Sequence, residues 1–334
     1  LLSACGEEYK GRRLPRHSGE PGEVLLVMDE AKWLGEEGDS LRNLLEAYVR
    51  QLPQAEPTFS LLQFSEDEMS NLLKQHRNII NIEIGPEAEG KNKVVLTKDK
   101  WSNNQLVFSA YANDRQEWFE LIREEFPKVV EIINNKEIER LQKIYRRNGN
   151  DELEQKVEQK FGLDILIPLD TEIAEESEDF LWIKRERVKY MGNTPHDITQ
   201  GFFIYRYPYT SDIAFTHDEL MSKRDSVLEK YVPGPKEGTY MTTEYRYPPE
   251  SREITLDDKY AVYTEGLWKT ENYFMGGPFR RIATVSPAGT HVIVVSGFAF
   301  APKFDKREYV RELQAVLASV SFTSEEQTSA QTTQ

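Results

Sequence analysis

The stretch Gly85-Pro86-Glu87-Ala88-Glu89-Gly90-Lys91 has the glycine and lysine spacing of a phosphate-binding loop. Such a loop needs a Ser or Thr hydroxyl after the lysine to hold Mg²⁺, and Asn92 stands there instead. Glu87 and Glu89 would repel phosphate. The residues that follow predict a strand, so no helix N-terminus is available for an anion. We interpret this stretch as a charged hairpin loop and expect no nucleotide or other cofactor.

The other residue types that carry out chemistry show no recognisable spacing. The five histidines are His17, His76, His196, His217 and His291. None pairs with another at the spacing of a zinc site, which needs three or four ligands, so we expect no metal. There is no Gly-x-Ser-x-Gly nucleophile motif. The 57 acidic residues leave a hydrolytic carboxylate pair open, but we predict no catalytic residue and favour a protein without enzymatic activity.

The single cysteine, Cys5, follows Leu2-Ser3-Ala4, and this pattern looks like a bacterial lipobox. Small residues let the extended chain enter a narrow peptidase site, and the thiol accepts a diacylglyceryl group. We therefore predict lipidation of Cys5 and an exported protein. The polar residues up to Gly22 predict a flexible tether, so residues 1–22 are interpreted as a lipobox remnant and tether.

An aromatic segment in the second half is the candidate surface for a ligand or partner. Its two glycines permit close approach of another backbone segment, and the proline that follows them has a fixed φ. The segment is either a rigid aromatic loop that meets a ligand or partner, or a tight connection between strands with its aromatic residues in the core. The candidate residues are Trp268, Tyr273, Phe274, Met275, Gly276, Gly277, Pro278 and Phe279.

Length and composition limit the alternatives. A chain of 334 residues with 39% hydrophobic residues can form two domains, each with its own core. Its 42 basic and 57 acidic residues give a net charge of −15, which opposes binding to nucleic acid. No run approaches the 18 apolar residues of a transmembrane helix. A lone cysteine cannot form an internal disulfide.

Hydrophobic periodicity places strands and helices in both halves. In the first half we predict strands at 24–28, 59–64, 94–97 and 105–111, and the segment 76–80 is predicted to lead into a further strand that ends at Ile84. Amphipathic helices are predicted from Asp39 or Ser40 to Leu52, from an Asp114–Glu117 capping box with a kink at Pro127, and onward to Phe161.

In the second half we predict strands at 166–169, 180–185, 202–207, 239–247, 260–268, 279–285 and 291–300. Helices are predicted at 217–231 and after Asp305. Successive strands without helices between them favour antiparallel sheets. The predicted fold is α+β, in two halves that each contain a mainly antiparallel sheet with helices packed on it. The predicted domains are 23–163 and 164–322, followed by a disordered tail at 323–334.

Several segments together resemble a known family. They are His76-Arg77-Asn78-Ile79-Ile80, Asp99-Lys100-Trp101 with Gln105, Gly266-Leu267-Trp268, Asn272 to Phe279, and Ala301-Pro302-Lys303. With the lipobox, they resemble the domain of unknown function 4837 family of Gram-negative envelope lipoproteins, over residues 1 to about 322. The resemblance implies an exported, anchored protein and no known reaction. Only lipid attachment at Cys5 carries over to a residue.

The sequence thus predicts a membrane-anchored envelope lipoprotein that binds or scaffolds a partner without catalysis. We expect it in the cell envelope, at the outer membrane, facing the periplasm or the surface. The membrane is reached through the N-terminal lipid, and the partner is a protein or a glycan rather than nucleic acid. The alternatives are an envelope hydrolase acting on glycan or cell-wall material and a structural subunit of an envelope complex.

Overall fold

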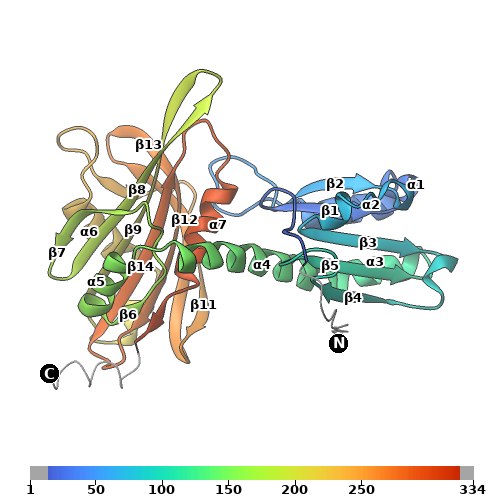
Figure 1. Cartoon of the computed structure of the whole chain (residues 1–334). Helices are drawn as coiled ribbons and strands as arrows, with labels where there is room; N and C mark the ends of the chain where they lie inside the picture. The colour runs from blue at the N-terminus through green and yellow to red at the C-terminus, as the bar shows by residue number, and fades with distance from the viewer. Residues whose placement is uncertain (1–13, 324–334) are drawn as a thin grey trace. The chain divides into compact units, whose positions relative to one another are not determined.

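A computed structural model describes residues 14–323, and these residues form two compact units (Figure 1). Unit 1 contains residues 14–49 and 57–140, and unit 2 contains residues 50–56 and 141–323. The sequence predicted the boundary between the two domains near residue 163. The division lies earlier because helix α4 (Phe126–Arg147) runs through it with one unbroken amphipathic pattern, so no shift in composition marks the boundary.

Unit 1 is built on a five-stranded sheet with the order β2-β1-β3-β5-β4. Its strands are β1 (Glu23–Val27), β2 (Ser60–Phe64), β3 (Asn78–Ile84), β4 (Lys93–Lys98) and β5 (Leu106–Ala112). The pairs β1/β2, β1/β3 and β3/β5 are parallel, and only β4/β5 is antiparallel. The α+β class is confirmed, but the prediction of a mainly antiparallel sheet is wrong for this half, because connections between the strands cross over rather than turn back.

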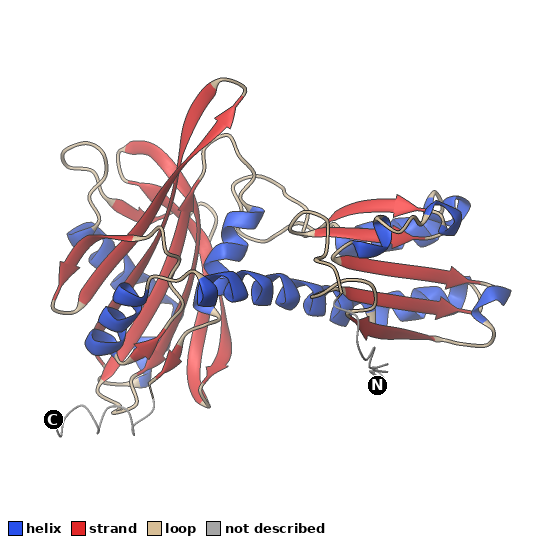
Figure 2. Cartoon of the chain, in the orientation of Figure 1, coloured by secondary structure: helices blue, strands red, loops and turns tan. Residues whose placement is uncertain are grey.

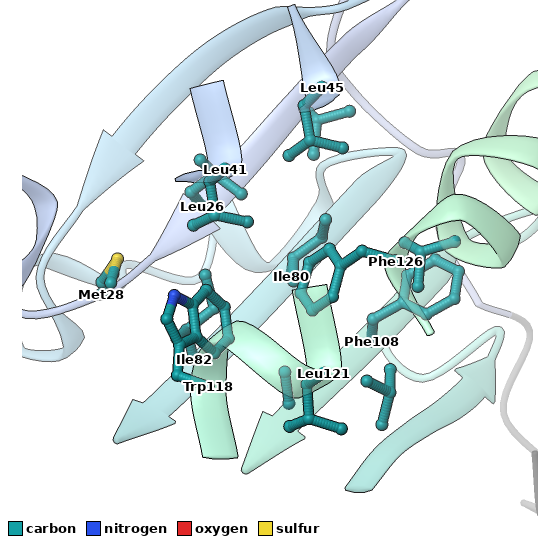
Figure 3. Packing of buried hydrophobic residues seen from close by; sticks show 14 of the residues in the cluster. Leu26, Met28, Leu41, Leu45, Ile80, Ile82, Phe108, Trp118, Leu121 and Phe126 are labelled. Atoms are coloured by element: carbon teal, nitrogen blue, oxygen red, sulfur yellow. The ribbon is translucent and has the colours of Figure 1, made fainter. Parts of the chain in front are cut away.

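The helices of unit 1 cover one face of this sheet (Figure 2). They are α1 (Glu30–Trp33), α2 (Glu36–Leu45), α3 (Arg115–Glu124) and α4. Their apolar stripes, which include Trp118 of α3, meet the strand residues that point to the same side, among them Leu26, Ile80 and Phe108 (Figure 3). The predicted N-cap is confirmed, since Asp114 Oδ1 accepts from Glu117 N at 2.9 Å, but Glu117 Oε2 accepts from Asn113 N and so does not complete the predicted capping box. Pro127 lies at the start of α4 and separates it from α3 instead of kinking one helix.

Two predictions for the loops of unit 1 are corrected. The Gly85–Lys91 stretch contains a 3₁₀ turn, η3 (Pro86–Ala88), and it is not a hairpin loop, because β4 pairs with β5 and not with β3. Within the predicted tether, residues 14–22 are ordered against the unit. Arg16 bridges to Asn103, and Ser18 bridges to His76, through the backbone. The tether prediction is therefore wrong for this part.

Unit 2 is built on an eight-stranded sheet with the order β10-β12-β13-β14-β9-β8-β7, and β11 also pairs with β12. All of its pairings are antiparallel, as predicted. The strands are β7 (Glu172–Ser177), β8 (Phe180–Met191), β9 (Thr194–Pro208), β10 (Met241–Thr243), β11 (Glu250–Leu256), β12 (Lys259–Thr270), β13 (Tyr273–Val285) and β14 (His291–Phe300). A small separate sheet pairs β6 (Leu163–Asp164) with β15 (Ser321–Phe322).

Helices pack on both faces of the larger sheet. The helix α6 (His217–Tyr231), predicted with these bounds, packs on the face that carries Phe203, Phe279 and Phe298. The helix α7 (Arg307–Leu317) packs on the opposite face, where Gln200 Nε2 donates to Tyr309 O at 3.0 Å. The remaining helical segments of this unit are the end of α4 at residues 141–147, α5 (Asp151–Phe161) and the 3₁₀ turn η4 (Asp212–Phe215).

The N-terminus of α7 is capped from far away in the sequence. Glu56, which is buried, accepts hydrogen bonds from Lys306 N at 2.7 and 2.8 Å and from Arg307 N at 2.6 Å. A carboxylate at this position satisfies free N–H groups and opposes the positive end of the helix dipole. The segment 50–56 therefore belongs structurally to unit 2.

Candidate functional site

The uncovered face of the unit 1 sheet changes from apolar to polar along its strands. The first row across this face contains Leu25, Ile79 and Val107, which are register partners on β1, β3 and β5. These side chains are buried, and Phe64, Met69, Leu73 and Trp101 pack against them from the loops and β2. The amino-terminal part of this face is thus closed by a small second core.

The next rows, toward the carboxyl ends of the parallel strands, mix apolar and polar side chains, since buried Val27 on β1 is the register partner of Asn81. Asn81 is the register partner of Ser109, and Glu83 is the register partner of Tyr111. Alternation along β3 and β5 places these four side chains on the face away from the helices. A sheet face that was simply a core would stay apolar along its length, so this change in polarity needs another explanation.

A groove with a volume of about 830 Å³ lies over the polar rows. Strands β1, β3 and β5 form the floor of this groove. The segments around residues 65–69, 74 and 100–101 form its walls. The lining residues are Val27, Met28, Asp29, Lys32, Ser65, Glu66, Asp67, Met69, Lys74, Asn81, Ile82, Glu83, Ile84, Glu87, Lys100, Trp101, Ser109 and Tyr111. Crevices at the carboxyl ends of parallel strands are the usual ligand sites of open α/β sheets.

Charges of both signs surround the groove. Lys32 Nζ donates to Ile84 O at the end of β3, and Lys100 Nζ lies 4.4 Å from the ring centroid of Trp101. Partial burial, followed by the nearby Glu66 carboxylate, raises the pKa of Glu83. The lining holds three lysines and five carboxylates, so no single strong charge dominates the site.

The walls of the groove are held by local hydrogen bonds. Ser65 and Glu68 form a capping box around η1 (Glu66–Glu68), with Ser65 N and Oγ both 2.8 Å from Glu68 Oε2. These bonds lower the pKa of Glu68. At the other wall, Gln105 Oε1 accepts from Trp101 N at 2.9 Å. The 3₁₀ turn η2 (Leu73–Gln75) completes this wall. Both walls are thus fixed to the sheet that forms the floor.

The surface predicted from sequence is largely inside unit 2. Trp268 is 2% exposed and Phe279 is fully buried, and both belong to the core under α6. Gly277 and Pro278 are buried too. The prediction that these four residues face a partner is wrong. Their aromatic content reflects packing, since Trp268 Nε1 also donates to Ala299 O at 3.2 Å inside the sheet.

The paired glycines lie within β13 rather than in a loop. Gly276 and Gly277 are register partners of Lys269 and Trp268 on β12. A Cβ on Gly277 would lie 2.1 Å from Ala299 O, and one on Gly276 would lie 2.6 Å from Trp268 O. These positions therefore require glycine because neighbouring backbone approaches closely. The second interpretation, aromatic residues in the core, fits better than a rigid binding loop.

Two residues of the predicted surface are accessible. Tyr273 and Phe274 follow the turn between β12 and β13, Phe274 is fully exposed, and Met275 is half-buried. Lys236 Nζ lies 5.3 Å from the ring centroid of Tyr273. A partner role for these three residues stays a prediction. Cys5 and most of the predicted C-terminal tail lie outside the described residues.

Neither a metal cluster nor a membrane-spanning helix is found within residues 14–323. No group of three or more His, Cys, Asp or Glu side chains in this range could hold a metal ion. No helix in the same range is long and apolar enough to cross a bilayer. Sequence reasoning missed the groove, although Asn81 and Glu83 on β3, and Ser109 and Tyr111 on β5, alternate with apolar residues in its pattern.

The chain matches two family profiles, one over each part. The family described as Domain of unknown function (DUF4837) matches residues 150–319, which is about half of the chain, and a second described as Domain of unknown function (DUF8532) matches residues 17–146. The protein belongs to the DUF4837 family, as predicted, but the match covers residues 150–319 and not residues 1 to about 322, and the motifs at 76–80 and 99–105 lie in the part that matches DUF8532. No curated protein matches the chain.

Solved structures resemble it only weakly. LpqN of Mycobacterium tuberculosis, described as involved in cell envelope biogenesis, aligns with 16% identity and a TM-score of 0.27, over 48% of this chain and 83% of that one. A protein from Bacteroides thetaiotaomicron aligns with 11% identity and a TM-score of 0.21, over 50% of this chain and 47% of that one.

Proposed function

We propose that this protein is a lipid-anchored envelope protein whose unit 1 binds an oligosaccharide in the groove without chemical change. The observation that carries the proposal is the change on β3 and β5, on one sheet face, from buried Ile79 and Val107 to the polar pair Asn81 and Ser109, beside a β1 that stays apolar at Val27. Neutral amide and hydroxyl groups on a rigid floor suit a ligand rich in hydroxyls.

The walls support the same ligand class. Trp101 and Tyr111 offer apolar ring surface with polar edges, which suits the faces of sugar rings. Because lysines and carboxylates are interspersed, the groove favours a neutral or zwitterionic oligosaccharide over a strongly charged ligand.

The binding proposal is tested by calorimetric titration of the full chain with peptidoglycan fragments and other soluble envelope oligosaccharides. Asn81→Ala and Ser109→Ala should each weaken binding of the sugar about tenfold, through loss of one hydrogen bond to the ligand. Asn71→Ala is the matched control, since Asn71 is exposed in the same unit and does not line the groove. Equal affinities for Asn81→Ala and the control would contradict the groove as the site.

The envelope location in this proposal rests on the Leu2–Cys5 motif, which lies outside the described residues. Anchoring through Cys5 predicts that Cys5→Ala shifts the protein from the membrane pellet to the supernatant. Mass spectrometry should find acyl chains on the N-terminal peptide of the natural protein and none on the variant.

A second candidate function, hydrolysis of the bound glycan, is favoured by one observation. Glu83 and Glu66 both line the groove, and partial burial followed by the Glu66 carboxylate raises the pKa of Glu83, which is the direction that a general acid needs. Release of new reducing ends by the wild type, lost in Glu83→Gln, would establish a hydrolase. Unchanged glycan after prolonged incubation would exclude hydrolysis and leave binding as the proposed function.

A further inference from the structure

A cluster of polar side chains is buried in unit 2 between α6 and the sheet. Arg224 comes from α6, Arg281 from β13, Tyr205 and Tyr207 from β9, and Ser296 from β14. Arg281 and Ser296 are register partners, so their side chains share a face. Arg224 is 1% exposed and Arg281 is fully buried.

Both guanidinium groups use only part of their hydrogen-bonding capacity. Arg281 Nη1 donates to Leu220 O at 2.8 Å, and Arg224 Nη1 donates to Thr243 Oγ1 at 2.7 Å. Within residues 14–323, Nε and Nη2 of both arginines have no hydrogen-bond partner. The hydroxyl groups of Tyr205, Tyr207 and Ser296 also lack one within that range. This concentration of unpaired groups in one place is unusual for a folded protein.

The charge of the cluster is not balanced by a nearby carboxylate. Asp225 Oδ1 lies 3.5 Å from Arg224 Nη1, but the Asp225 carboxylate already accepts from Thr243 N at 2.9 Å, Thr243 Oγ1 at 2.6 Å and Tyr245 OH at 2.7 Å. No carboxylate in the described part of the chain forms an ion pair with Arg281. One guanidinium is partly compensated, since Arg224 Cζ lies 4.0 Å above the ring centroid of Phe279.

Arg224 remains a cation under ordinary conditions. Burial lowers its pKa to about 10, and the Asp225 carboxylate acts against that shift. A buried cation with unused donors costs several kcal/mol unless an anion or a hydrogen-bonded partner offsets it.

We propose that Arg224 and Arg281, with the hydroxyl groups of Tyr205 and Ser296, bind a small inorganic anion between α6 and the sheet. Halide or a small oxyanion such as phosphate would accept the free N–H and O–H donors and neutralise charge at the same time. Ordered water could accept the same donors but would leave the charge in place, so water is the opposing outcome of the test. The site is independent of the groove, which lies in unit 1.

The first test locates the anion directly. Crystals of the full chain grown in bromide should show an anomalous peak between the guanidinium groups of Arg224 and Arg281. A refined structure with water there and no anomalous signal, at bromide concentrations that label surface sites, would overturn the proposal.

The second test measures stability against bromide or inorganic phosphate, with gluconate holding the ionic strength constant. Above the Kd, each tenfold rise in the concentration of the free anion should raise the Tm of the unit 2 transition by about 3–5 °C. Arg281→Met should remove this dependence. Tyr205→Phe, which deletes only a hydroxyl, should shift the titration to higher anion concentration and serves if Arg281→Met does not fold.

Arg280→Met is the matched control for that titration. Arg280 is equally buried in β13 but points to the other face, where its Nε lies 3.4 Å from Glu265 Oε2 and Nη2 donates to Arg50 O at 2.7 Å. The Arg280→Met variant should lower the Tm without changing how the Tm depends on the anion concentration. A Tm of the wild type that is the same in bromide, phosphate and gluconate, or an anion dependence that survives in Arg281→Met, would contradict the site.

Discussion

Each unit of this protein has a cluster built on two buried arginines, Arg77 and Arg140 in unit 1 and Arg224 and Arg281 in unit 2, and the two clusters differ in their counter-charge. In unit 1, Glu137 lies between Arg77 and Arg140, with N···O distances of 2.5 and 2.6 Å. Asn78 Nδ2 adds a bond to Glu137 Oε1 at 2.8 Å, and Arg140 Nη2 donates to Arg77 O at 2.9 Å. In unit 2, Arg224 and Arg281 have no carboxylate between them within the described residues.

The difference teaches what a buried arginine needs. In unit 1 the chain itself supplies a carboxylate that both arginines share, and the cluster joins strand β3 to helix α4, with only Nε of Arg77 lacking a partner among the two guanidinium groups within the described residues. In unit 2 the chain supplies one close acceptor to each arginine and a carboxylate only at 3.5 Å from Arg224, so Nε and Nη2 of both arginines lack a partner within the described residues. The two pairs should therefore respond in opposite ways when a charge is removed.

The largest expected effect is on the complete cluster of unit 1. Glu137→Gln leaves Arg77 and Arg140 buried without a counter-charge, and it should lower the free energy of unfolding of unit 1 by about 3–5 kcal/mol. Urea denaturation followed by tryptophan fluorescence measures it. Glu139→Gln on the same helix is the control, because the Glu139 side chain is 46% exposed and a surface carboxylate of this kind contributes about 0–1 kcal/mol through its ion pair. Similar losses for both variants would show that Glu137 does not balance the pair.

A moderate effect is expected from acid, through His17 in unit 1. Burial, followed by the positive charges of Arg140 and Arg77, lowers the pKa of His17 to about 4, against the opposing charge of Glu137. Its pKa in the unfolded chain is near 6.5, so the unfolded state binds the extra proton between these values. This stabilising contribution is complete above about pH 6.5 and is lost as the pH falls toward 4.

Replacing this histidine isolates its share of the pH dependence. His17→Gln cannot take up the proton, so its unfolding midpoint should fall less between pH 6.5 and 4 than that of the wild type. The measurement is urea denaturation at a series of pH values. Parallel curves for the two proteins would exclude His17 as the source.

The smallest effect is expected from the incomplete cluster of unit 2. Arg281→Met replaces a buried, unbalanced charge with an apolar side chain of similar length. In gluconate, with no small anion present, its free energy of unfolding should stay within about 1 kcal/mol of the wild type or exceed it. A loss as large as that of Glu137→Gln, measured in the same way, would show that Arg281 is fully compensated by the protein.

Local patterns predicted much of the secondary structure. The apolar stripe of α6, the Asp114 cap and the long apolar run of β14 lie where the sequence placed them, because each depends on neighbours in the chain. The strand predicted at 166–169 is absent, and Leu169 is exposed. The polar strands β7 and β11 were missed because few of their side chains are buried, so they show no apolar alternation.

The direction of the strands and the position of the candidate site could not be predicted from the sequence, for a different reason. The parallel pairing of β1 with β2 and β3 depends on contacts between distant segments. The groove requires Asn81 and Ser109 to be register partners, which no local pattern states. Conversely, Trp268 and Phe279 looked like a surface because an aromatic cluster in a chain has the same composition whether it faces a ligand or a core.

The Glu56 cap of α7 has a bearing on how this protein can be divided. The family match at residues 150–319 does not include Glu56, although two backbone amides at the start of α7 depend on its carboxylate. A gene fragment cut at the junction near residue 140 would encode a second half that is missing one of its own parts. Any recombination that transferred this half intact would have to carry a short upstream peptide along with it.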